Sequence, residues 1–113
     1  MITEFSFGRI VINGLAHTND IKVVKGHVIP DWWRKSGHRV EIEDVQDILD
    51  ADPEILVIGK GQPGYMNLTE NLRKLLEKKD IHLIEEPTSK AIQTFNRLFD
   101  VGKNVSACFH VGC

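Results

Sequence analysis

The pattern with the clearest potential chemistry is a set of three spaced glycines in the middle of the chain. Gly59, Gly61 and Gly64 spell Gly-x-Gly-x-x-Gly after a short apolar run, and Glu85 follows where a ribose-binding acid is expected. The backbone N–H groups of such a loop can hold a pyrophosphate at the start of a helix. By spacing alone, these residues match a dinucleotide-binding fingerprint.

Three features argue against that function. Pro63 lacks an N–H where the loop would need a donor, and the candidate helix caps, Asn67 and Thr69, start the next helix several residues too late. The fingerprint also lies mid-chain, whereas it normally opens a fold of two mononucleotide-binding halves. We therefore expect no bound cofactor, and expect the glycines to turn the chain at the end of a strand.

The same loop remains the default position for a ligand pocket. The run 55–58 is apolar on both faces, which is typical of a central strand, and open α/β sheets bind ligands at the carboxyl ends of such strands. Lys60 could hold an anion there, or it could be a solvated loop lysine. The sequence leaves both interpretations open.

Two adjacent tryptophans mark a second candidate surface. Trp32 and Trp33 lie with Arg34 and His38 in the segment 31–39, which follows no periodicity. Strand alternation cannot direct both rings into one core, so at least one ring is expected to be available to a partner or ligand. We expect these four residues to lie beside the loop 59–64 as a functional surface; the alternative is that both rings fill a gap between layers.

The C-terminal residues suggest a thiol–imidazole pair that the spacing disfavours. In an extended strand, His110 and Cys113 would lie about 10 Å apart, so only a turn at Gly112 could bring them together. Two cysteines with scattered histidines are also too few for a structural zinc site. We predict no catalytic residue and no metal site, with Cys108 and Cys113 as free thiols.

Length and charge limit the remaining function classes. The chain of 113 residues has the size of one domain, which we expect to span 1–113. Its 14 Lys and Arg against 16 Asp and Glu create no field that would recruit nucleic acid. No segment approaches the roughly 20 apolar residues of a membrane span, and no signal-peptide pattern opens the chain. These features predict a cytoplasmic protein without membrane insertion.

The pattern in the first third of the chain predicts an antiparallel β meander. We expect a strand over 5–12 with a bulge or a close backbone approach at Gly8, a hairpin turn at Asn13-Gly14, and strands over 20–24 and 27–29. A short amphipathic helix from Glu41 should then end before Asp52-Pro53.

The remainder alternates strand and helix. We expect strands at 54–58, 81–84 and 105–111, a turn at 85–87, and helices whose apolar stripes include Leu68 and Leu72 in one and Phe95 in the other. Asn67 or Thr69 should cap the first helix, and Thr88 or Ser89 the second. Right-handed crossovers make the three strands parallel, which gives an α/β core with an N-terminal β extension.

Short sequence segments along the chain resemble one known family. They are Phe7-Gly8, Pro30 with Trp32, Gly37-His38, Leu56 to Gly61, Lys90-Ala91-Ile92 with Phe95-Asn96, Gly102 with Val105 and Ala107, and Phe109 to Cys113. Together these segments resemble the adipogenesis-associated Mth-type domain family, a family of unknown function that includes a mitochondrial complex I assembly factor. Gly112 stands where the family usually has threonine, so a role for that hydroxyl is not expected here.

The resemblance implies a three-layer α/β domain with a mixed central sheet and an added N-terminal antiparallel β layer. Members with described roles act through other proteins, so the resemblance favours a protein-binding or assembly-factor-like module over an enzyme. The alternative is a binder of a small anionic or nucleotide-like ligand at Gly59–Gly64. Self-association is compatible with the sequence, and the candidate binding residues are Trp32, Trp33, Arg34, His38, Gly59, Lys60, Gly61, His110 and Cys113.

Overall fold

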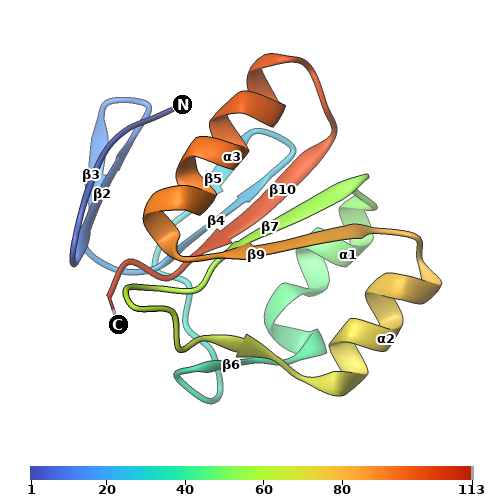
Figure 1. The fold of residues 1–113 in the computed structure, drawn as a ribbon. Coiled ribbons are helices and arrows are strands. Elements are labelled where there is room, and N and C mark those ends of the chain that lie inside the picture. The colour runs from blue at the N-terminus through green and yellow to red at the C-terminus, as the bar shows by residue number, and fades with distance from the viewer. Residues whose placement is uncertain (113) are drawn as a thin grey trace.

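A five-stranded mixed sheet forms the middle layer of the computed structural model, which describes residues 1–112 (Figure 1). Its strands, in spatial order, are β5 (His27–Ile29), β4 (Ile21–Val24), β10 (Val105–Phe109), β7 (Ile55–Gly59) and β9 (His82–Glu86). β7 is parallel to both β10 and β9, while β4 runs antiparallel to β10. Every residue of β7 and β10 is buried, which confirms the prediction that both are inner strands.

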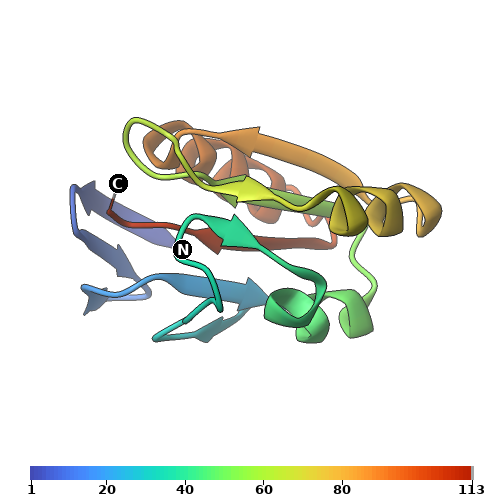
Figure 2. The same ribbon diagram turned by 90° about the horizontal axis from the view of Figure 1, so that it is seen from below.

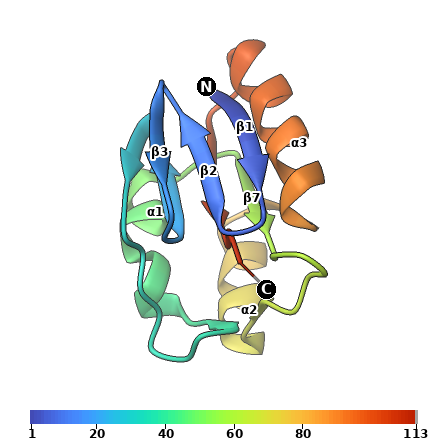
Figure 3. The same ribbon diagram turned by 90° about the vertical axis from the view of Figure 1, so that its left-hand side faces the viewer.

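The helices lie on both faces of this sheet and give the predicted three layers. Helix α3 (Thr88–Asp100) and the outer strands pack on one face, where Ile10, Phe95 and Phe109 belong to one apolar core (Figure 3). Helices α1 (Gln46–Ala51) and α2 (Glu70–Lys78) pack on the other face around Leu56 and Ile58 (Figure 2). The mixed α/β fold with an added antiparallel sheet is therefore confirmed.

The N-terminal region forms two sheets, whereas the sequence predicted one meander. Strands β1 (Ile2–Ser6), β2 (Arg9–Ile12) and β3 (Leu15–His17) form the outer sheet, while β4 and β5 join the central sheet because β4 pairs with β10. The hairpin at Asn13-Gly14 is confirmed by positive φ angles of 52° and 79°. Gly8 forms no bulge: its φ of 84° allows a turn between β1 and β2, and the register irregularity lies between Ile2 and Glu4. The alternative prediction of a close backbone approach is confirmed, because the Gly8 N–H donates to the Val111 carbonyl at 2.7 Å.

A short parallel ladder joins the two loops that flank α1 and α2. Strand β6 (Arg39–Val40) pairs with β8 (Asn67–Leu68), and a 3-10 turn, η1 (Ile42–Val45), precedes α1. Leu68 therefore lies in a strand, although the sequence placed it on the helical stripe. Of the two predicted caps, Thr69 is confirmed, because its Oγ1 accepts the Leu72 N–H at 3.2 Å.

The connection into α3 also differs from the prediction. Glu85 and Glu86 belong to β9, not to a turn, because they continue its parallel ladder opposite Ile58 and Gly59 of β7. The Glu85 side chain pairs with Arg73, and that of Glu86 accepts the Thr94 hydroxyl. Neither Thr88 nor Ser89 caps α3, since the helix starts at Thr88 after Pro87 without a side-chain cap. The Thr88 hydroxyl instead makes tertiary hydrogen bonds beside the candidate site.

Candidate functional site

The candidate residues gather where β7 and β10 end. These parallel strands finish side by side at Gly59 and Phe109, and the His110 N–H donates to the Gly59 carbonyl at 2.9 Å. The turn between β1 and β2, the segment 30–38 and the segment 60–66 approach the C-terminal end of the chain from different sides (Figure 3). This is the edge at which α/β sheets commonly bind ligands.

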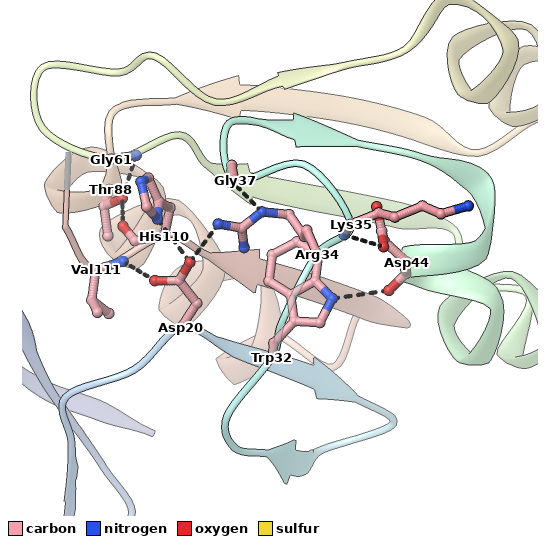
Figure 4. A network of polar contacts seen from close by, with 10 residues as sticks. All are labelled: Asp20, Trp32, Arg34, Lys35, Gly37, Asp44, Gly61, Thr88, His110 and Val111. Atoms are coloured by element: carbon pink, nitrogen blue, oxygen red, sulfur yellow. Dashed lines mark hydrogen bonds and ion pairs between the residues drawn. The ribbon is translucent and has the colours of Figure 1, made fainter.

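Asp20 is the centre of a buried ionic network at this edge (Figure 4). Its Oδ2 lies 2.8 Å from Nη2 of Arg34 and 2.7 Å from Nδ1 of His110, and its Oδ1 accepts the Val111 N–H at 2.8 Å. The side chains of Asp20, Arg34 and His110 are 11%, 5% and 12% exposed. Both oxygens of Asp20 are therefore engaged with protein donors.

The network keeps the Asp20 carboxylate ionised. Burial by itself would raise the pKa of Asp20, but hydrogen bonds from His110 and the Val111 N–H, the charge of His110 and the bond from Arg34 outweigh burial and lower it. Sequence analysis missed Asp20 because no local motif marks it, and its partners are distant in sequence.

Arg34 and Trp32 form one buried unit. The Arg34 guanidinium lies 4.5 Å from the centroid of the Trp32 ring, and its Nε donates to the Gly37 carbonyl at 2.8 Å. The Trp32 Nε1–H donates to the Asp44 carbonyl at 2.9 Å, and Trp32 is only 5% exposed. Trp32 is therefore not the ring that the sequence expected to be available, because its indole fills the core between α1 and the sheet.

Trp33 is the tryptophan that remains available. It is 74% exposed and lies beside a cavity of about 290 Å³ whose lining includes Gly8, Asp20, Arg34, Gly37, His110 and Gly112. The ring of His38 lies 5.3 Å from that of His110 and 6.2 Å from the exposed Tyr65. Trp33, Arg34 and His110 thus share one cavity, and His38 adjoins it.

The glycine loop lacks the donors that a phosphate cradle needs. The N–H groups of Lys60, Gly61 and Gln62 donate to the Glu86 carbonyl, the Thr88 hydroxyl and the Gly112 carbonyl. Helix α2 begins only at Glu70, after β8. The loop is therefore held by the protein itself and not organised around an anion.

Of the two cysteines, Cys108 lies in β10. Cys108 is a buried free thiol, and burial raises its pKa, which makes it a poor nucleophile. Cys113 lies outside the described residues, so its predicted relation to His110 stays a prediction. Within residues 1–112, no group of three His, Cys, Asp or Glu side chains has the arrangement of a metal site.

A family comparison covers nearly the whole chain. Residues 2–110 match the model of a protein family described as a protein of unknown function, DUF498/DUF598. The chain belongs to this family. This match supports the resemblance as far as membership of a family of unknown function.

Solved structures share the fold of this DUF498/DUF598 chain. The conserved hypothetical protein PH1505 from Pyrococcus horikoshii OT3 is 27% identical over 100% of this chain and 99% of its own, with a TM-score of 0.85. An outer membrane protein from Bartonella henselae is 23% identical over 99% and 94%, with a TM-score of 0.80. A Bordetella pertussis protein described as a Mth938-like domain is 18% identical over 97% and 84%, with a TM-score of 0.72.

The similarity to the last two proteins shows the fold alone. Neither provides a reaction or a partner for this DUF498/DUF598 chain.

None of the helices in residues 1–112 has the length and apolar character to cross a bilayer.

We predict that this family member does not bind NAD or FAD with a dissociation constant in the low micromolar range. The physical reason is that the amides of Lys60, Gly61 and Gln62 are already bonded and Pro63 has none. Titration calorimetry with each cofactor measures this directly. A binding free energy near -8 kcal/mol, which corresponds to about 1 µM, would contradict the prediction.

Gly59 has a packing role that a substitution can test. A Cβ at this position would lie 2.9 Å from the Phe109 ring and 3.3 Å from Thr88 Cα. We expect Gly59→Ala to lower the free energy of unfolding by roughly 1–3 kcal/mol, the usual cost of overpacking, as measured by urea denaturation. Gly37→Ala is the control, because no described atom lies within 4 Å of its Cβ, and an equal loss there would refute the packing explanation.

Proposed function

We propose that this DUF498/DUF598 chain is a protein-binding module of the assembly-factor kind, and that Trp33 is the centre of its binding surface. The observation that carries this proposal is the 74% exposure of Trp33 between two neighbours that are themselves nearly buried. Tryptophan is one of the three residue types most enriched among binding hot spots. The resemblance to the adipogenesis-associated Mth-type domain family, with its mitochondrial complex I assembly factor, supports the same proposal.

The backbone around Trp33 is held in place before any partner binds. Trp32 is fixed by its core packing and its hydrogen bond to Asp44, and Arg34 is fixed by Asp20 and Gly37. A side chain that is presented on an ordered backbone loses less conformational entropy on binding. Trp33 is therefore arranged as an anchor and not as a mobile loop residue.

Catalysis has less support than binding. The groups suited to acid–base chemistry, Asp20 and His110, contact each other, and Asp20 also accepts from Arg34 and Val111. The neighbouring Thr88 hydroxyl donates to the His110 carbonyl and accepts the Gly61 N–H. These contacts hold the strand ends together. The proposal therefore assigns no reaction to this site.

The alternative function, capture of an anionic or nucleotide-like ligand at Gly59–Gly64, has weaker support. Three consecutive amides of that loop donate to protein acceptors. Our proposal also retains the expectation of a cytoplasmic protein whose partner is neither nucleic acid nor a membrane, since the net charge is -2. Self-association is included, because a second copy is itself a protein partner.

The proposal is tested by placing a photo-crosslinking phenylalanine analogue at position 33 in the native host. We expect a discrete protein adduct from position 33 and none from position 101, the matched control. Val101 is 67% exposed and follows α3 at the opposite end of β10. The adduct identifies the partner by mass spectrometry.

The purified partner then decides the role of the side chain. Trp33→Ala should weaken binding about 30-fold or more, the effect of losing a hot spot of at least ~2 kcal/mol, and should change the melting temperature by less than about 2 °C. Val101→Ala should change neither quantity. Equal affinity of Trp33→Ala and the wild type, or the absence of any adduct specific to position 33, would contradict the proposal.

A further inference from the structure

The segments around the Trp33 cavity carry an excess of positive charge. The ranges 7–9, 17–20, 31–40, 59–66 and 110–112 contain five Lys and Arg residues against two Asp, whereas the whole chain has 14 against 16. The remainder of the chain is therefore strongly acidic. The five cations are Arg9, Arg34, Lys35, Arg39 and Lys60. The acidic residues Glu41, Glu43 and Asp44 follow directly and face Lys35, so the positive charge of this region rests on the other four cations.

Three of these cations, Arg9 among them, make no ion pair within residues 1–112. Lys35 pairs with Glu43 and Arg34 with Asp20, but within residues 1–112 neither Arg39 nor Lys60 has an ion pair. Arg39 donates to the Ser36 hydroxyl and is exposed, and Lys60 is half-buried at the end of β7. Neither residue lines the cavity itself, but Arg39 lies two positions after Gly37, which does, and Lys60 follows Gly59, whose carbonyl accepts the His110 N–H.

The wall of the cavity is polar, and its negative charge is already paired with protein donors. Within residues 1–112, Asp20 is the one carboxylate that lines it, and both of its oxygens accept from Arg34, His110 or Val111. The Arg34 side chain is 5% exposed, and its buried Nη1 has no hydrogen-bond acceptor among the described residues. The charge of this one carboxylate is offset by the guanidinium that pairs with it, so the cavity wall presents no unpaired negative charge to an incoming anion.

The size of the cavity limits what enters it. About 290 Å³ lies at the lower end of the range for small-molecule sites, and one wall is the exposed indole of Trp33. Such a volume holds a side chain or two of an extended segment. It is small for a nucleotide.

We infer that the partner of this surface is an acidic protein segment, which places Asp or Glu side chains over Arg39 and Lys60 and packs an apolar or aromatic side chain against Trp33. The inference deepens the proposed function and rests on it. Charge complementarity favours an acidic segment as the occupant. The surface of a second copy is also acidic outside its own site, but that copy's basic site would then have to be shared or left open.

The test is a selection from a random linear peptide display library against the full chain. We expect enriched peptides in which Asp or Glu flank an aromatic or aliphatic residue. Each selected peptide, and its isostere with Asn and Gln in place of Asp and Glu, is then measured by fluorescence anisotropy. The isostere should bind about 10-fold more weakly, and the affinity of the acidic peptide should fall as salt rises.

Matched charge variants locate the effect. The double variant Arg39→Gln with Lys60→Gln should weaken the acidic peptide about 5- to 10-fold and leave the melting temperature unchanged. Lys78→Gln with Lys79→Gln, two exposed positions at the end of α2, should leave the affinity unchanged. Trp33→Ala should abolish enrichment of both the acidic peptide and its isostere.

The outcomes separate the inference from the proposed function. Trp33-dependent peptides without an acidic excess would overturn the inference and leave the binding surface in place. Peptides that bind Trp33→Ala as well as the wild type would overturn both. Selective binding of phosphoserine peptides over Glu peptides, or displacement of the acidic peptide by millimolar acetate alone, would also overturn the inference, because the ligand would then be a different anion.

Discussion

Replacement of Asp20 by asparagine is expected to lower the free energy of unfolding by about 3 kcal/mol or more at pH 7. The reason is that Arg34, with a side chain only 5% exposed, would keep a buried positive charge without its counter-ion. Removal of one partner from a buried pair typically costs about 3–5 kcal/mol. For a domain of 113 residues this corresponds to a fall in melting temperature of roughly 10 °C, measurable by calorimetry.

An exposed ion pair gives the control for this prediction. Lys35 and Glu43 lie 3.2 Å apart with side chains 72% and 61% exposed, so Glu43→Gln should change stability by less than about 0.5 kcal/mol. A loss of less than about 1 kcal/mol for Asp20→Asn would show that the network is not a stabilising element of the site.

The pH dependence of Asp20→Asn follows from the direction of its pKa shift. Because the folded-state pKa of Asp20 is below its ordinary value of 3.8, folding favours the ionised form. The stabilisation is therefore fully present above pH 3.8 and is lost as the pH falls through the folded-state pKa. Urea denaturation of wild type and Asp20→Asn from pH 6 downward should give a difference that shrinks only below pH 3.8.

Trp32→Ala should also cost about 3–5 kcal/mol in the free energy of unfolding. The substitution would remove a ring that is 5% exposed in the core with Ile48 and Leu49, and would leave a cavity under the guanidinium of Arg34. Thermal unfolding followed by circular dichroism measures the loss.

Trp32→Phe separates ring packing from hydrogen bonding. The Asp44 carbonyl would lose the indole donor at 2.9 Å but keep the Lys22 ammonium at 3.3 Å, so the hydrogen-bond part should be about 1 kcal/mol. The phenylalanine variant should therefore be clearly more stable than the alanine variant. A Trp32→Ala protein that melts within a few degrees of the wild type would contradict the buried assignment.

Much of the fold follows from local patterns in the sequence. The run 55–58, apolar on both faces, predicted an inner strand because only a central strand lacks a polar side, and β7 is fully buried. Asn13-Gly14 predicted a hairpin through the positive φ angles that this turn requires. The stripe with Leu72 predicted α2, and Thr69 was one of the two caps predicted for it. Each of these signals depends on residues within a few positions of one another.

The errors share one cause, which is that a distant partner changed the local preference. The sequence predicts Thr88 as a helix cap, but its hydroxyl donates a hydrogen bond to the His110 carbonyl 22 residues away. Leu68 fits a helical stripe, but it pairs with Val40 of β6 and therefore lies in a strand. The sequence carries no local record of these pairings.

The candidate site likewise combines features that local sequence predicts with features that depend on distant contacts. Sequence alone determined that two tryptophans in a non-periodic segment could not both enter one core, and that the segment 59–64 would lie at the end of an inner strand. Only the tertiary structure decided that Trp32 is buried and Trp33 exposed, because that choice depends on where α1 and the Asp44 carbonyl lie relative to the sheet. Asp20 entered the site for a similar reason: its contact with His110 joins residues 90 positions apart, and burial in a shared environment, not spacing, gives the pair its strength.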